Sequence, residues 1–211
     1  MIVECLEAEF LGRRETNALK LIKQARFPTP HAHINDITYL TSRDITKPQM
    51  TSLAQCDWIE TGRNVLLLSP TGAGKSYIAQ ALGIAACQKQ YSVAFTRLKE
   101  LDYQLQLADT DKEKYHRILA RYKDVDLVIL DDFFTTPISN QTAYDLFEIF
   151  VARTDAGRST MIAAQSEPAD WYQAFPTEIS ADSTLSRITT GATIIRLGTA
   201  NMRDHYSIDN D

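Results

Sequence analysis

A short loop of small residues between an apolar run and a Lys-Ser pair is the feature that most constrains the fold. Residues 69–76 read SPTGAGKS, directly follow the apolar run Val65–Leu68 and precede a helix-forming stretch that begins at Tyr77. In such a strand–loop–helix unit, the loop N–H groups and the positive end of the helix dipole converge on the oxygens of a polyphosphate. The segment therefore predicts a phosphate-binding loop that joins a strand to a helix.

Two side chains of this loop have predictable roles with ATP and Mg²⁺. The Lys75 ammonium is expected to reach the β- and γ-phosphates, and the Ser76 hydroxyl to complete the Mg²⁺ shell. A Cβ at Gly74 would obstruct the approach of the backbone to the phosphates. Ser69 stands where the pattern GxxxxGK usually begins with glycine, a change that weakens the motif without breaking it. The residues expected to contact the nucleotide are Ser69, Pro70, Thr71, Gly72, Ala73, Gly74, Lys75, Ser76 and Tyr77.

A second apolar run ends in two carboxylates. Residues 126–132 read DLVILDD, so a strand buried on both faces would end at Asp131 and Asp132. Open α/β sheets bind their ligands at this end of the strands. We expect Asp131 to hold Mg²⁺, directly or through water, and Asp132 to orient and deprotonate the attacking water. The alternatives are a chance Gly-rich turn and a strand that exits into an acidic turn, and the presence of both motifs in one chain disfavours them.

Composition excludes several classes of protein. The chain has 211 residues and a net charge of −5, which fits one core and not a uniformly basic nucleic-acid binder. No apolar run approaches the ~20 residues of a membrane span, and the first ten residues lack the basic start of a signal peptide. Cys5, Cys56 and Cys87 have no metal-like spacing, so we expect reduced thiols in a cytoplasmic protein. His31 and His33 indicate an exposed loop and not a metal site.

Alternating strand and helix patterns predict an α/β fold with a five-stranded parallel sheet covered by helices on both faces. Three segments are expected: a helical segment over 1–30, a connecting segment over 31–62 with a short helix near 49–59, and a nucleotide-binding core over 63–211. The expected strands are 65–68, 92–96, 127–130, 160–164 and 193–197. The core helices are expected near 76–88, 98–107, 112–122, 141–153, 168–175 and 183–189. Along the chain, strand 92–96 separates the loop strand from the carboxylate strand, which is the plan of ATPases with an inserted central strand.

The chain resembles the IstB-type ATPases that assist insertion-sequence transposases, relatives of the DnaC helicase loaders within the AAA+ class of P-loop proteins. The resemblance extends over most of the chain and rests on the order and spacing of several short motifs. These are Ala25–Pro28, Cys56–Ile59, the phosphate loop, Leu130–Phe133 with Thr136-Pro137, Arg158–Thr160, Trp171, Leu185–Ile188 and Gly198–Arg203. The family usually carries a longer helical region before its core, so the resemblance implies that Met1 begins within the last part of that region and that the copy is short, truncated or degenerate.

The resemblance implies that the protein binds ATP, oligomerises on double-stranded DNA and recruits a transposase. Gln165 resembles the sensor that contacts the γ-phosphate or the water, and Arg187 the arginine that a neighbouring subunit inserts against the γ-phosphate. Such a role suits the planar fork of arginine. Arg203 is equally well interpreted as a second phosphate sensor or as part of a structural salt bridge. The alternative functions are a DnaC-like helicase loader that acts on single-stranded DNA and a catalytically idle nucleotide-binding remnant.

Basic residues between 97 and 123 are candidates for a DNA-binding stripe. Leu98, Leu101 and Leu105 share one helical face and should be core. The cations expected on the opposite side are Arg97, Lys99, Lys112, Lys114, Arg117, Arg121 and Lys123. Acidic residues lie among them, so a solvated helix face is an almost equally good interpretation. Contacts to phosphates would be weakly selective for sequence and would weaken with salt.

Overall fold

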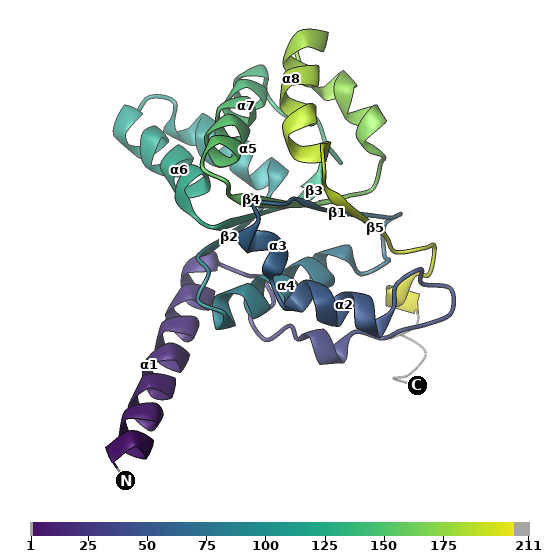
Figure 1. Ribbon diagram of the computed structural model, residues 1–211. Helices are drawn as coiled ribbons and strands as arrows, with labels where there is room; N and C mark the ends of the chain where they lie inside the picture. Colours follow the sequence, from purple (N-terminus) through teal and green to yellow (C-terminus); the bar gives the residue numbers. More distant parts are fainter. Residues whose placement is uncertain (1, 205–211) are drawn as a thin grey trace.

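A five-stranded parallel sheet forms the centre of the protein. The structure is a computed structural model that describes residues 2–204, with side chains from residue 9 onward (Figure 1). Its strands are β1 (Val65–Leu68), β2 (Val93–Arg97), β3 (Leu127–Phe133), β4 (Ser159–Ala164) and β5 (Thr193–Arg196). They are all parallel, in the order β2-β3-β4-β1-β5. The predicted sheet is confirmed. The strand inserted between β1 and β3 is β4, however, whereas β2 lies at the edge.

Helices cover both faces of the sheet (Figure 1). One layer contains α1 (Ile2–Ala25), η1 (Ile34–Asp36), α2 (Lys47–Ala54), α3 (Asp57–Glu60) and α4 (Lys75–Gln88). The other contains α5 (Leu98–Ala108), α6 (Lys112–Asp124), α7 (Asn140–Asp155), η2 (Pro168–Ala174) and α8 (Glu178–Thr189). Alternate residues of β1 enter the two hydrophobic clusters, Val65 and Leu67 one of them and Leu66 and Leu68 the other. This double burial is why the central strands are continuous apolar runs.

Four elements differ from the sequence-based prediction. The helix expected over 49–59 is interrupted at Cys56, whose φ of +65° separates α2 from α3. Strand β3 continues to Phe133, so the two carboxylates belong to the strand instead of following it. Residues 168–174 form a 3₁₀ helix, and α8 begins at Glu178 because Thr177 and Ser180 form a capping box.

The helix α1 joins the body only through its second half. Ala18 and Ala25 are buried, and Leu21 and Ile22 pack against the same core cluster, as the helical spacing predicts. The first half extends away from the body in Figure 1. The predicted segment limits at residues 30 and 62 stay predictions, and the end of the core segment, 205–211, lies outside the described residues.

Two cysteines are free thiols inside the core. Cys56 and Cys87 are buried, and burial raises the pKa of Cys56 to about 11 and that of Cys87 to about 12. The side chain of Cys5 lies outside the described residues. Within residues 2–204, no helix is both long and apolar enough to cross a membrane.

A buried arginine joins α7 to the amino-terminal ends of β3 and β4. Arg153 is 1% exposed. Its five hydrogen bonds go to the carbonyl oxygens of Tyr122 (2.8 Å), Val125 (2.8 Å), Asp126 (3.0 Å) and Ser159 and to the hydroxyl of Thr160 (3.1 Å). One side chain thus binds carbonyls at the end of α6, in the connection to β3 and at the start of β4.

Replacing Arg153 by leucine should destabilise the fold strongly. Each buried carbonyl that loses its partner costs about 1–3 kcal/mol, so we expect a loss of at least about 3 kcal/mol. Arg158→Leu is the matched control, because Arg158 is partly exposed and donates to the Lys123 carbonyl and the Asp124 carboxylate; its loss should be about 1 kcal/mol. Unfolding in guanidinium chloride measures the free energy of unfolding of both variants. Equal losses for the two variants would contradict a structural role specific to Arg153.

Candidate functional site

The phosphate loop connects β1 to α4 at the carboxyl-terminal edge of the sheet. Gly72 and Gly74 have φ values of +84° and +85°, a region that side chains with a Cβ rarely adopt. Gly74 is the N-cap of α4, and no side chain caps this helix end. The first N–H groups of α4 are therefore available to an anion.

A cavity of about 580 Å³ lies over this helix end. This volume is within the usual range of small-molecule sites, ~300–1,000 Å³. From the predicted set, the cavity is lined by Thr71, Gly72, Gly74, Lys75, Ser76, Tyr77, Asp132, Gln165 and Arg203. Ser69, Pro70, Ala73 and Asp131 do not line it, but each is bonded to a residue that does. Two motifs that are far apart in the sequence thus meet at one cavity.

The Lys75 ammonium is held inside the phosphate loop. Lys75 is 6% exposed, and its Nζ donates to the carbonyl oxygens of Ser69 (2.6 Å) and Pro70 (2.8 Å) and, at 3.3 Å, to the Ser69 hydroxyl. Burial lowers the pKa of Lys75, and the nearby carboxylates of Asp131 and Asp132 oppose that shift. The serine that replaces the usual first glycine therefore adds an acceptor for the lysine.

Ser76 and Asp131 form a site that fits Mg²⁺. Ser76 Oγ donates to Asp131 Oδ1 at 2.9 Å, whereas Oδ2 of the same carboxylate is buried with no hydrogen-bond partner among the described residues. Burial raises the pKa of Asp131, and the Ser76 hydrogen bond opposes that shift. An unpartnered buried carboxylate oxygen is costly, and a hard cation would satisfy it. No cluster of three or more His, Cys, Asp or Glu side chains occurs in the described part, so phosphate oxygens and water would complete the shell.

Asp132 lies where β3 is irregular. The register between β3 and β4 shifts between Leu130 and Phe133, and Asp132 has a φ of +51°. Its side chain is 43% exposed and lies 3.6 Å from Arg97 Nε. A left-handed conformation costs a residue with a Cβ about 1–2 kcal/mol, and such strain is concentrated at functional sites. In a regular strand Asp132 would point to the face opposite Asp131. At the irregularity Phe133 enters the cluster on that opposite face instead, and Asp132 lines the cavity.

The three residues predicted from the family resemblance lie in different places. Gln165 directly follows β4, which pairs with β3, and lines the cavity. Arg203 lines it from the carboxyl-terminal segment. Arg187 does not: its guanidinium lies 5.4 Å from the centre of the Phe147 ring and donates to the Ser183 hydroxyl at 2.8 Å. The roles of these three residues stay predictions.

The connecting segment and the carboxyl-terminal segment complete the cavity, and the sequence predicted only Arg203 among their contributions. Arg43 is 5% exposed and donates to the carbonyl oxygens of Thr38 (2.6 Å) and Ala73 (2.8 Å). The Met202 N–H donates to the Gly72 carbonyl at 2.8 Å. A Cβ at Gly74 would lie 3.1 Å from Arg43 Nη2, so this glycine also makes room for the arginine. A single arginine in an irregular segment has no periodicity or motif that would identify it beforehand.

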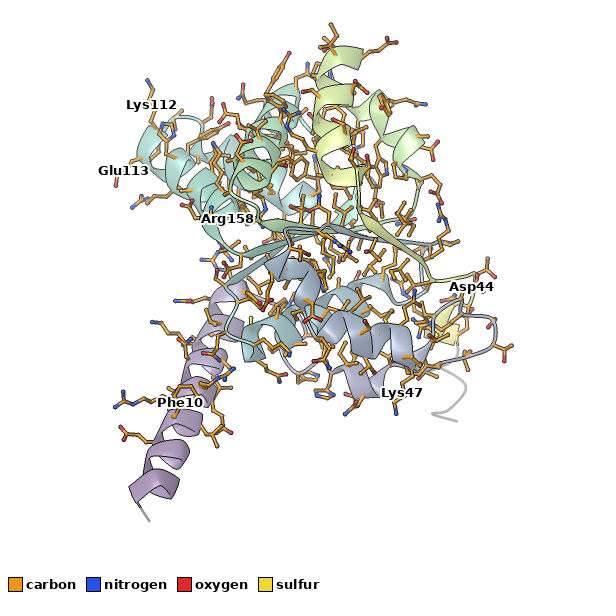
Figure 2. The ribbon with its side chains drawn as sticks, in the orientation of Figure 1. Phe10, Asp44, Lys47, Lys112, Glu113 and Arg158 are labelled. Carbon is orange, nitrogen blue, oxygen red and sulfur yellow. The ribbon has the colours of Figure 1, made fainter. Side chains whose placement is uncertain are left out.

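Most of the cations expected in a DNA-binding stripe have partners within the protein, and their role stays a prediction. Arg97 lies beside Asp132, Lys99 pairs with the buried Asp102 at 2.9 Å, and Arg121 donates to the Gln24 carbonyl at 3.1 Å. Lys123 pairs with Glu148 and Arg117 with Glu113. Lys112 and Lys114 are exposed on α6, and Figure 2 shows Lys112 and Glu113 together at the solvent-facing end of that helix. The core residues Leu98, Leu101 and Leu105 are buried as predicted.

Nearly the whole chain matches a known family. The model of the IstB-like ATP binding proteins matches residues 1–209. The chain belongs to this family. This IstB-like chain is 33% identical over 168 residues to an insertion sequence ATP-binding protein of Sinorhizobium fredii, which covers 80% of the chain and 68% of the relative. It is also 33% identical over 160 residues to the IS1162 ATP-binding protein of Pseudomonas fluorescens, covering 76% and 68%.

Solved structures share the fold of this IstB-like chain. The DnaC helicase loader superposes with a TM-score of 0.67 at 17% identity, over 79% of this chain and 96% of that one. AMPPCP-bound DnaA from Aquifex aeolicus gives a TM-score of 0.66 at 17% identity, over 87% of this chain. This chain spans about half of that DnaA chain, 54%. The predicted AAA+ P-loop fold and the predicted family are confirmed.

Proposed function

We propose that this IstB-like protein binds Mg·ATP and hydrolyses it slowly, as an ATP-dependent helper of DNA transposition. The observation that carries the proposal is the pairing of two carboxylates beside Lys75. The buried Asp131 keeps one oxygen without a hydrogen-bond partner among the described residues, beside the Ser76 hydroxyl, and Asp132 faces the cavity that Ser76 lines. One carboxylate is placed to bind a metal ion and the other to accept a proton from a water molecule, and ATP hydrolysis requires both roles.

In the proposed reaction, Asp132 accepts a proton from a water molecule as the water oxygen bonds to the γ-phosphorus. The bond between the γ-phosphorus and the bridging oxygen breaks, and ADP and phosphate leave. Lys75 stabilises the negative charge on the β- and γ-phosphates, and Gln165 orients the water. Ser76 and Asp131 would hold Mg²⁺, which neutralises phosphate charge when bound. The shorter side chain of Asp132, where glutamate is more usual, accounts for slow turnover.

Arg187 is proposed to act on the site of a neighbouring copy. It lies on α8, does not line the cavity of its own chain, and is partly exposed. Its present partners, the hydroxyl and carbonyl of Ser183 and the Phe147 ring, are neutral, so no carboxylate has to be displaced before it binds a phosphate. An arginine supplied in this way contributes by stabilising charge on the transferred phosphoryl group. Homo-oligomerisation is therefore part of the proposal.

Double-stranded DNA and a transposase are the proposed partners, in the cytoplasm. This rests on the similarity to insertion sequence ATP-binding proteins. Two alternatives use the same fold: a helicase loader on single-stranded DNA, favoured by the likeness to the DnaC helicase loader, and a nucleotide-binding protein without turnover. Phosphate release in the presence of duplex or single-stranded DNA separates the three. Stimulation by duplex supports the transposition helper, stimulation by single strands alone supports the loader, and no release supports the idle protein.

Removing Arg187 should lower phosphate release by about 10³-fold or more, the usual contribution of an arginine supplied by a neighbour. ATP affinity should change little, and Arg187→Lys should not restore the rate, because lysine lacks the planar fork. Complementation gives the sharpest test. A mixture of Arg187→Ala and Asp132→Asn chains should regain part of the activity, since an intact site on the first chain can then meet the arginine of the second. No recovery in the mixture would contradict action across an interface.

A further inference from the structure

A basic groove follows the open edge of the sheet. It occupies about 610 Å³ between the second half of α1, the start of β2 and the end of α6. Among the described residues that line it are four cations and no carboxylate: Lys20, Lys23, Arg26 and Arg121. We call this set of residues the edge groove. Such an excess of positive charge contrasts with the net charge of −5 of the whole chain.

Three of these cations have no ligand among the described residues. Lys20, Lys23 and Arg26 are exposed, and no salt bridge or hydrogen bond of their side chains occurs in the described part of the chain. Arg121 differs, because it donates to the Gln24 and Ala25 carbonyls and so fixes the end of α1 beside the sheet. The structure thus fixes the wall of the groove and leaves the other three charges available to an anion.

The positive lining continues toward the nucleotide cavity. Arg26 and Arg121 also line a smaller cavity of about 80 Å³ next to the second half of β2. There the lining adds Arg97, which lies 3.6 Å from Asp132, together with one carboxylate, Glu100. The basic residues therefore extend from the start of β2 to the edge of the proposed catalytic site.

We propose that the edge groove binds the phosphodiester backbone of DNA. This inference rests on the proposed function and names the surface that contacts its nucleic acid. Sequential phosphates carry a dense row of negative charge, and unpaired lysine and arginine side chains neutralise it while releasing counterions. Contacts of this kind position the nucleic acid without reading bases. On α6, by contrast, Asp111 and Glu113 lie next to Lys112 and Lys114, and Arg117 is already paired with Glu113.

The same charges could instead protect the edge strand. Exposed edge strands pair with other chains unless charged side chains prevent it, and β2 is an edge strand. This explanation predicts that removing the charges changes self-association and leaves DNA binding intact. The two explanations therefore differ in a measurable way.

The test compares two triple variants that each remove three positive charges. The groove variant is Lys20→Ala/Lys23→Ala/Arg26→Gly, and the control is Lys112→Ala/Lys114→Ala/Arg117→Ala on α6. Glycine suits position 26 because the φ of Arg26 is +63°. Binding of the full chain to a duplex and to a single strand of equal length is measured with ATP at several salt concentrations. Unchanged ATP affinity verifies that each variant is folded.

The groove variant should bind DNA about 10²-fold more weakly at ~0.1 M salt. The plot of the logarithm of the association constant against the logarithm of the salt concentration should become less steep by about 2–3 units of slope. The α6 variant should retain both values. The form of DNA that the wild type binds more tightly, duplex or single strand, is the form whose phosphates the groove contacts. A groove variant with the affinity and slope of the wild type overturns the inference, and self-association of that variant would then assign the charges to edge protection. Wild-type protein that binds neither DNA form would instead overturn the DNA-binding part of the proposed function.

Discussion

Replacing Lys75 by alanine should reduce Mg·ATP affinity by about 10²-fold or more. The reason is that Lys75 is the one side-chain cation of the phosphate loop itself, and an ammonium facing several phosphate oxygens in a partly buried site contributes several times the free energy of an exposed ion pair. This ammonium lies inside the loop and donates to the Ser69 and Pro70 carbonyls. Calorimetric titration of Mg·ATP into each protein measures the loss.

A matched control distinguishes the loss of a positive charge anywhere on the protein from the loss of the ammonium inside the phosphate loop. Lys89 directly follows the same helix, α4, and its Nζ bonds only the Gln55 side chain among the described residues. Lys89→Ala removes the same charge far from the loop and should bind ATP like the wild type. Thermal unfolding checks that Lys75→Ala is folded. A folded Lys75→Ala protein with wild-type affinity would show that residues 69–76 form only a structural turn.

The two neighbouring carboxylates should have separate effects on binding and turnover. Asp131→Asn should weaken Mg²⁺-dependent binding and lower phosphate release, because Asp131 supplies the free oxygen next to Ser76. Asp132→Asn should keep ATP affinity and lower phosphate release by about 10²–10⁴-fold, the usual contribution of a general base. The second variant should therefore accumulate bound ATP. Single-turnover kinetics with and without Mg²⁺ measures both, and equal turnover of Asp132→Asn and wild type would remove Asp132 from this role.

Asp131→Asn should also stabilise the ligand-free protein at neutral pH. Burial raises the pKa of the Asp131 carboxyl in the folded state above its ordinary value of 3.8, so the ionised form destabilises folding at neutral pH. As the pH falls through the raised pKa, the folded wild type binds a proton and this penalty disappears. The stability advantage of Asp131→Asn should accordingly be largest at neutral pH and absent below pH ~3.8. A constant difference across this range would contradict an ionised, buried Asp131.

The sequence predicts the parts of this site that lie within one strand–loop–helix unit. Val65–Leu68 and the loop after it belong to one local unit, so the strand, the turn and the helix start follow from adjacent residues. The order of the strands in the sheet does not follow from adjacent residues, because it depends on packing between distant segments. The structure places β2 at the edge of the sheet. Asp132 was identified by type, whereas its orientation depends on a bulge against β4 that no local pattern encodes.

The roles of Arg43 and Arg121 also could not be predicted from local sequence patterns. Arg43 closes the nucleotide cavity through two backbone carbonyls that lie 5 and 30 residues away in the sequence. Arg121 was a candidate for the DNA-binding stripe between residues 97 and 123, yet its guanidinium binds the end of α1. Hydrogen bonds from long side chains to distant carbonyls leave no periodic signal, so only the folded chain identifies such residues.

The most direct test of the proposed function is phosphate release by the wild-type protein with Mg·ATP, measured with and without duplex DNA. The account predicts slow release, below the ~1–10³ s⁻¹ of most enzymes, that duplex DNA increases and that Lys75→Ala abolishes. Release from the wild type that equals the Lys75→Ala background, with and without duplex, would contradict ATP hydrolysis as the activity of this protein.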